Sequence, residues 1–140
     1  MAIERVCRAR LSAALVVLLV IPVGLLARSH RAGADPATLS GFLSTYTGDT
    51  LWPILFFFLG RFAFPAANRR RIAAVVLTLT LGLEFGQLRQ PEFLQWLRRQ
   101  PILGFMLGNT FVWSDVACLL VGSVLAVLID AILSVSLKKR

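Results

Sequence analysis

Ionisable side chains stand within, or at the edge of, apolar runs that are long enough to cross a membrane. In chain order they are Arg61 in the run 51–67, Glu84 and Gln87 in the run 72–88, and Asp115 at the head of the run 116–137. An ionised side chain in hydrocarbon costs at least about 2.5 kcal/mol, so such groups usually face one another or a water-filled cavity. We therefore expect the function of the chain to depend on them.

Two of these groups are placed to meet in the outer half of the membrane. At 1.5 Å per residue, Glu84 sits roughly 18 Å above the inner end of its run, and Arg61 sits roughly 17 Å below the point near Asp49 or Thr50 where its span begins on the outer side. Arg61 can extend toward the outer side along its stem, where its guanidinium would form a paired contact with the carboxylate of Glu84. This ion pair would either belong to a site or only neutralise the two charges and fix the helix register.

Further polar and aromatic side chains fall at the same outer level. Thr80, Glu84 and Gln87 are spaced four and three residues apart, so they share one helix face. Carboxylates in a membrane can take part in proton relays or act as acid and base. The candidate site residues are Asp49, Trp52, Arg61, Glu84, Gln87, Arg98, Asn109, Trp113 and Asp115.

Several of these residues also have purely structural explanations, which the sequence leaves open. Asp49 and Asp115 stand where helices are expected to begin, and a carboxylate there caps the helix and meets the positive end of its dipole. Gln87 can hydrogen-bond to a neighbouring helix, and the tryptophans can anchor the chain at the membrane interface. Asp130 lies near the inner end of the last run, and we expect it to pair with Lys138 or a neighbour.

The composition is that of a membrane protein rather than a soluble domain. Of the 140 residues, 57% are apolar and 16% are charged, whereas about 25% are charged in soluble domains; the mean hydropathy is +0.76. A membrane span needs at least roughly 17 apolar residues. Four runs qualify, over residues 11–27, 50–67, 72–88 and 114–137. The sequence therefore predicts an all-α, polytopic membrane protein with four transmembrane helices in one domain, residues 1–140.

The segments between these spans are less regular. Residues 32–48 are expected to form a solvated external loop. Residues 91–113 predict an interfacial or re-entrant segment. Pro91 opens a short amphipathic helix with Trp96 at headgroup level, and residues 101–112 are apolar but too short to cross. Whether residues 101–112 re-enter the membrane or extend the fourth span stays open.

The distribution of basic residues predicts the orientation of the chain. The formal net charge is +8, with nine basic residues flanking the spans on one side and five on the other. The side richer in Lys and Arg usually faces the cytoplasm, so both termini are expected there. A cleaved signal peptide at the N-terminus is the alternative, and it would leave three spans. No basic stripe is interleaved with aromatic residues, so nucleic acid is not an expected partner.

Neither a metal nor a cofactor is expected. Cys7, Cys118 and His30 cannot supply a usual zinc site. No nucleophile, metal set or phosphate loop accompanies the carboxylates. Enzymatic activity is therefore not favoured, although Glu84 and Asp115 could serve as an acid–base pair.

Three motifs cover much of the candidate site: Gly48-Asp49-Thr50-Leu51-Trp52, Glu84-Phe85-Gly86-Gln87-Leu88 and Leu107-Gly108-Asn109-Thr110-Phe111-Val112-Trp113-Ser114-Asp115. Together they resemble a family of small bacterial membrane proteins, domain of unknown function 2809. The chain is also similar to VanZ-like proteins, which are associated with resistance to teicoplanin-type glycopeptides. On that comparison Glu84, Gln87, Arg98, Asp115 and Gly122 occupy the shared positions. These resemblances imply a location in the bacterial cytoplasmic (inner) membrane.

The sequence favours an envelope protein whose outward-facing polar pocket binds a lipid headgroup, an envelope precursor or an amphipathic compound, as in a VanZ-like resistance role. One alternative is a small proton-coupled transporter with Glu84 as the titrating group. Another is a structural or accessory subunit of a membrane complex. The lipid bilayer is the expected partner, and the formation of a homo-oligomer stays open.

Overall fold

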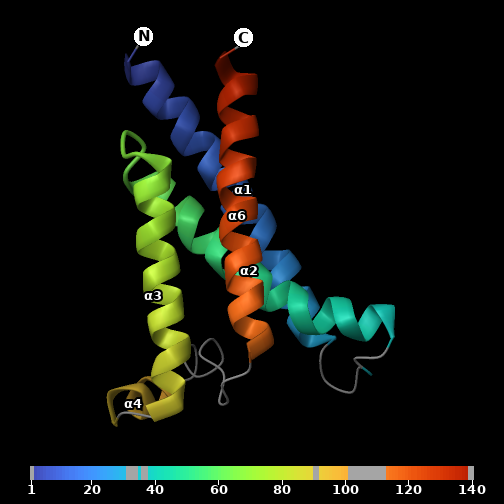
Figure 1. Cartoon of the computed structure of the whole chain (residues 1–140). Helices are drawn as coiled ribbons and strands as arrows, with labels where there is room; N and C mark the ends of the chain where they lie inside the picture. Colours follow the sequence, from blue (N-terminus) through green and yellow to red (C-terminus); the bar gives the residue numbers. More distant parts are fainter. Residues whose placement is uncertain (1, 31–34, 36–37, 90–91, 101–112, 139–140) are drawn as a thin grey trace.

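The described part of the chain is built from helices alone. The computed structural model describes residues 2–30, 35, 38–89, 92–100 and 113–138. Within these residues there is no strand, so the expectation of an all-α fold is confirmed. The long helices are α1 (Ala2–Ser29), α2 (Leu39–Ala63), α3 (Arg69–Arg89) and α6 (Trp113–Lys138), and α4 (Glu92–Arg99) is short (Figure 1).

Helices α2 and α6 form the centre of the arrangement. Helix α2 packs against α1, α3 and α6, helix α3 packs against α2 and α6, and α1 lies mainly on α2. Figure 1 shows the start of α1, the turn between α2 and α3, and the end of α6 at one end of the bundle, which we call the inner end. The end of α3, helix α4 and the start of α6 lie at the opposite end, which we call the outer end.

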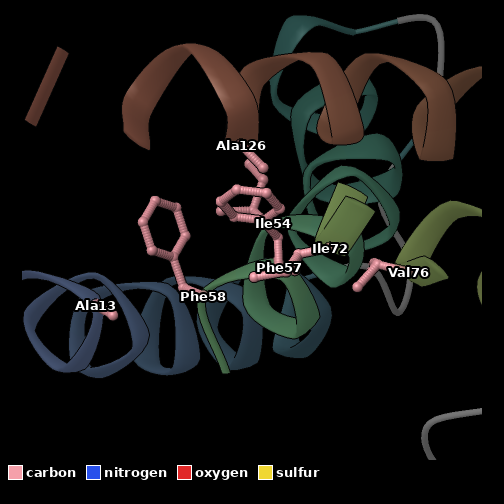
Figure 2. Packing of buried hydrophobic residues seen from close by; sticks show 7 residues of the cluster. All are labelled: Ala13, Ile54, Phe57, Phe58, Ile72, Val76 and Ala126. Carbon is pink, nitrogen blue, oxygen red and sulfur yellow. The ribbon is translucent and has the colours of Figure 1, made fainter. Parts of the chain in front are cut away.

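An apolar core lies between these two ends. Its centre is filled from α2 by Ile54, Phe57 and Phe58, and the two phenylalanines are each 1% exposed. Their rings meet edge to face at 5.2 Å. The other members are Ala13 of α1, Ile72 and Val76 of α3, and Ala126 of α6 (Figure 2). Because α1 and α6 each contribute an alanine, their backbones can pack closely against the bulky residues of α2.

Glycine permits a close approach of α6 to α2. A Cβ atom at Gly122 would collide with the backbone carbonyl oxygen of Thr50 and with Cγ of Pro53. A residue without a side chain is therefore required where α6 passes this part of α2.

Among the described residues, two helices rather than the expected four are long and apolar enough to cross a membrane by themselves. They cover Val6–Ala27 in α1 and Trp113–Ser136 in α6, and only 6% and 28% of the most apolar stretch of each is buried. The core helix of a soluble protein would be mostly buried, whereas large apolar side chains are exposed on all four long helices. In α2, Asp49 and Arg61 interrupt the apolar sequence.

The boundaries of α2 differ from the expected span over residues 50–67. The helix begins at Leu39, so the prediction of a solvated loop over residues 32–48 is wrong from residue 39 onward. Thr38 caps this start, because its hydroxyl oxygen accepts a hydrogen bond from the backbone N–H of Gly41 at 3.1 Å. The helix ends at Ala63, since a proline two residues later disfavours its continuation.

The short helix expected after residue 91 is present as α4. On this helix the rings of Phe93 and Trp96 stack on each other with centroids 6.4 Å apart, and both side chains are exposed. Residues 101–112 lie outside the described residues, so the choice between a re-entrant segment and an extension of α6 stays a prediction.

Candidate functional site

The structure divides the expected constellation between the two ends of the bundle. Arg61 lies at the inner end, in the last turn of α2. Glu84 lies fifteen residues beyond the start of α3, which is about 22 Å along the helix axis. The expected ion pair between Arg61 and Glu84 is therefore wrong.

Arg61 is held instead by Asp130 and by two backbone carbonyls. Its Nε donates a hydrogen bond to Oδ1 of Asp130 at 3.0 Å, and its Nη1 donates to the carbonyl oxygens of Pro65 at 3.0 Å and Ala67 at 3.1 Å. The side chains of Arg61 and Asp130 are 12% and 9% exposed. Nε of Arg69 lies 3.5 Å from Oδ2 of Asp130. Asp130 thus pairs with two arginines, and Arg61 fastens the turn between α2 and α3.

The extent of α2 explains why Arg61 points to the inner end. A helix over residues 50–67 would place Arg61 near its middle, whereas the helix over Leu39–Ala63 places it two residues from the end. A long cationic side chain extends toward the nearer polar surface. Pro65 was the signal in the sequence, because a helix that stops before this proline carries Arg61 in its last turn.

Two contacts set the register between α3 and α6. Arg69 meets Asp130 at the inner end, and the rings of Phe85 and Trp113 meet edge to face at the outer end, with centroids 6.4 Å apart. Phe85 is sixteen residues along α3 from Arg69, and Trp113 is seventeen residues back along α6 from Asp130. The two separations differ by one residue, so the register holds over most of the length of the pair.

This register places Glu84 and Asp115 at the same level on facing helices. Each of them lies fifteen residues from the contact between Arg69 and Asp130. The sequence-based expectation that these two carboxylates come from different helices to one level near the outer end agrees with this geometry.

Glu84 ends a stripe of buried side chains on α3. The members recur every four residues and are each 8% to 9% exposed: Ile72, Val76, Thr80 and Glu84. The stripe changes from apolar near the inner end to polar near the outer end. The hydroxyl of Thr80 donates to the backbone carbonyl of Val76 at 2.9 Å, so its hydrogen bond is made within the helix. Glu84 is therefore the charged group that this face carries to the outer end.

Helix α2 places Asp49 further inward than Glu84 and Asp115, because the backbone carbonyl of its neighbour Thr50 lies against Gly122. Gly122 is seven residues along α6 from Asp115, which is about 10 Å. Arg61 and Asp130 are 69 residues apart, and the same separation relates Pro53 to Gly122, which pack together. Helices α2 and α6 therefore run in the same general direction, toward the inner end, and cross at an angle (Figure 1). Asp49 is half-buried and lies one turn before Pro53. The alternative that Asp49 caps a helix is wrong, because α2 extends past it in both directions.

Asp115 and the two tryptophans have local partners. Asp115 is half-buried in the first turn of α6 and accepts a hydrogen bond from Oγ of Ser114 at 3.2 Å. A carboxylate there also meets the positive end of the helix dipole, so its structural explanation stays open. Trp113 is 72% exposed. Trp52 is half-buried and stacks on Phe56 with ring centroids 5.4 Å apart. The role of both tryptophans as interface anchors stays a prediction.

The remaining candidates cannot be placed by their side chains. Gln87 belongs to α3 and Arg98 to α4, but their side chains, and the whole of Asn109, lie outside the described residues. In the part of the chain that is described, no group of three His, Cys, Asp or Glu residues could hold a metal ion. The register of α3 and α6 brings Glu84 and Asp115 to one level, and we call these two residues the outer carboxylate layer. Ionised carboxylates accept hydrogen bonds from hydroxyl and ammonium groups.

A family comparison covers the same helices. The model of a family described as "Protein of unknown function (DUF2809)" matches residues 38–123. The match begins at Thr38, the N-cap of α2, and includes every residue of the outer carboxylate layer, while Asp130 lies beyond it. No solved structure matches the chain. The match spans more than half of the chain, so this protein belongs to the DUF2809 family of proteins of unknown function.

Proposed function

We propose that this chain is a multi-pass protein of the bacterial cytoplasmic membrane, in which α1, α2, α3 and α6 all cross the bilayer. Helices α2 and α3 have 25 and 21 residues, so they are about 37 Å and 31 Å long. The hydrocarbon core of a bilayer is about 30 Å thick. Within residues 72–88 of α3 the only charged residue is Glu84, which faces the bundle interior.

The distribution of exposed and buried side chains supports a lipid environment. Leu18 and Leu19 of α1 are each 67% exposed, and Ile132 of α6 is 65% exposed. Apolar surface of this extent would promote association in water. Charged groups of the spans show the opposite distribution, since Arg61 and Asp130 pair inside the bundle, as membrane-embedded charges generally do.

Cysteine labelling should reveal the cytoplasmic position of the N-terminus. Cys7 is exposed near the start of α1, and Cys118 is buried. With both termini in the cytoplasm, a membrane-impermeant maleimide should leave the chain unlabelled in intact spheroplasts and label it after permeabilisation. Cys7→Ser is the control that removes the label. Labelling in intact spheroplasts, or release of the chain from membranes by alkaline carbonate, would contradict the proposed topology.

We further infer that the outer carboxylate layer binds the polar part of an amphipathic envelope compound, such as a lipid headgroup or an envelope precursor. The observation that carries this proposal is the common level of Glu84 and Asp115 on facing helices. Hydroxyl and ammonium groups of such compounds donate hydrogen bonds to carboxylates. Arg61 is engaged with Asp130 at the inner end and does not contribute to this binding.

The apolar core favours binding over transport. A proton-coupled carrier needs polar groups along a path through the membrane. Between the outer carboxylate layer and the Arg61–Asp130 pair, the bundle is filled by Ile54, Phe57 and Phe58 (Figure 2). Helix α2 contributes no polar side chain to this apolar core. The carboxylates are therefore better suited to receive a ligand from the outer side.

Neutralising the carboxylates of the outer carboxylate layer should abolish the protection that the protein gives against envelope-active compounds. In a strain lacking the gene, the wild-type chain should restore growth in the presence of envelope-active compounds, including the teicoplanin-type glycopeptides suggested by the VanZ-like resemblance. Glu84→Gln and Asp115→Asn should not restore it, because a hydrogen bond to a charged group contributes about 1.5–3 kcal/mol. This corresponds to roughly tenfold to hundredfold weaker binding.

Minimum inhibitory concentrations measure this effect, with immunoblots of membrane fractions confirming equal amounts of each variant. Glu92→Gln is the matched control, because it makes the same chemical change at an exposed position on α4. Full restoration by Glu84→Gln and Asp115→Asn would rule out the carboxylate layer as the binding site. A role as a structural subunit would then be the better explanation.

A further inference from the structure

The inner end of the bundle presents arginines that no acidic side chain of the described residues neutralises. Arg70 and Arg71 are exposed in the first turn of α3. The acidic groups described at this end are Glu4, which pairs with Arg8 at 3.1 Å, and Asp130, which pairs with Arg61 and Arg69. No acidic side chain of the described residues forms an ion pair with Arg70 or Arg71.

Exposed aromatic side chains accompany these arginines. Phe62 and Phe64 stand at the end of α2 and are 47% and 67% exposed. The hydrogen bonds of Arg61 to the carbonyls of Pro65 and Ala67 hold the turn that joins this part of α2 to α3. The turn therefore places exposed apolar rings and exposed guanidinium groups at the same end of the bundle. An amphiphile with a negative headgroup and an apolar tail complements both.

We propose that the surface formed by Phe62, Phe64, Arg70 and Arg71 binds anionic phospholipids in the membrane leaflet at the inner end. This inference rests on the proposed membrane topology and extends it to the choice of lipid. The argument is one of charge complementarity: basic residues next to a membrane surface are attracted to anionic lipids, with a preference of about fivefold per residue. The guanidinium groups lie at headgroup level and the phenylalanine rings at the boundary with the acyl chains.

Lipid selectivity of the purified full-length chain tests this proposal. The protein in an uncharged detergent is titrated with phosphatidylglycerol or phosphatidylcholine of matched acyl chains, and bound lipids are counted by native mass spectrometry. The wild-type chain should retain phosphatidylglycerol preferentially. Arg70→Gln combined with Arg71→Gln should lower this preference by about fivefold per arginine, while lysine at both positions should preserve it.

Arg99→Gln is the control, because it removes an exposed arginine from α4 at the opposite end. Equal retention of the two lipids by the wild-type chain would overturn the proposal. The proposal would also be overturned if the double glutamine variant kept the preference for phosphatidylglycerol, or if the double lysine variant lost it. An equal fall of this preference in Arg99→Gln would overturn it as well. Carbonate extraction and Cys7 labelling of the same variants report the topology separately. A chain that spans the membrane without selecting phosphatidylglycerol therefore fails this inference alone.

Discussion

Asp130→Ala should lower the free energy of unfolding by about 3–5 kcal/mol, because it removes one partner of a buried ion pair and leaves the other charge in place. Arg61 would keep its hydrogen bonds to the carbonyls of Pro65 and Ala67 but lose the carboxylate that neutralises it. With only 12% of its side chain exposed, Arg61 would gain little compensation from solvent. The loss would be a large fraction of the stability of a typical domain, about 5–15 kcal/mol.

Reversible unfolding in mixed micelles, followed by circular dichroism, measures this change. Glu4→Ala is the control, because it breaks an exposed ion pair with Arg8 and should cost no more than about 1 kcal/mol. Arg61→Met combined with Asp130→Leu should recover much of the stability, since removing both charges leaves neither buried alone. Equal stability of Asp130→Ala and Glu4→Ala would show that the buried pair does not hold the bundle together.

Gly122→Val should destabilise the bundle by about 3 kcal/mol, at the upper end of the usual cost of overpacking. The first added carbon already collides with the Thr50 carbonyl oxygen and the Pro53 ring. Neither atom belongs to a flexible side chain, so α2 and α6 would have to move apart. Such a movement would also disturb the Arg61–Asp130 contact, which lies two turns further along the same pair of helices.

Gly82→Ala provides the control for this prediction. A Cβ atom at Gly82 would have no neighbour within 4 Å, so the better helix propensity of alanine should stabilise α3 by about 0.5–1 kcal/mol. Unfolding in mixed micelles should therefore give changes of opposite sign at the two glycines. Changes of the same sign and size would show that close contact at Gly122 does not limit the packing of α2 on α6.

The sequence predicted the helices best where apolar residues follow one another without interruption. The predicted range 72–88 falls within α3 at Arg69–Arg89, and 114–137 falls within α6 at Trp113–Lys138. Helix α2 was misplaced because its first turns contain threonine, glycine and aspartate, which are typical of loops. In the folded chain these residues continue a helix that starts at the Thr38 cap and packs against α1.

The same contrast applies to the candidate site. The level and face of Glu84 could be predicted, because the rise and periodicity of a helix are constant. The direction of Arg61 could not, because an arginine side chain can extend toward either end of a helix. Its choice depends on Asp130, which lies 69 residues away in the sequence. The level of a residue along a helix can therefore be predicted by counting residues. The partner of a long side chain can be identified only from the tertiary structure.

The ion pair between Arg61 of α2 and Asp130 of α6 has a consequence for biosynthesis. At a translation rate of roughly 5–20 residues per second, Arg61 leaves the peptidyl-transferase centre about 3–14 s before Asp130. During this interval the nascent helical hairpin of α2 and α3 can offer the guanidinium only the carbonyls of its own turn, which are made directly after it. Arrival of the last helix supplies the missing counter-charge. An unfinished polypeptide thus differs from a finished one by an unneutralised cation at its inner end.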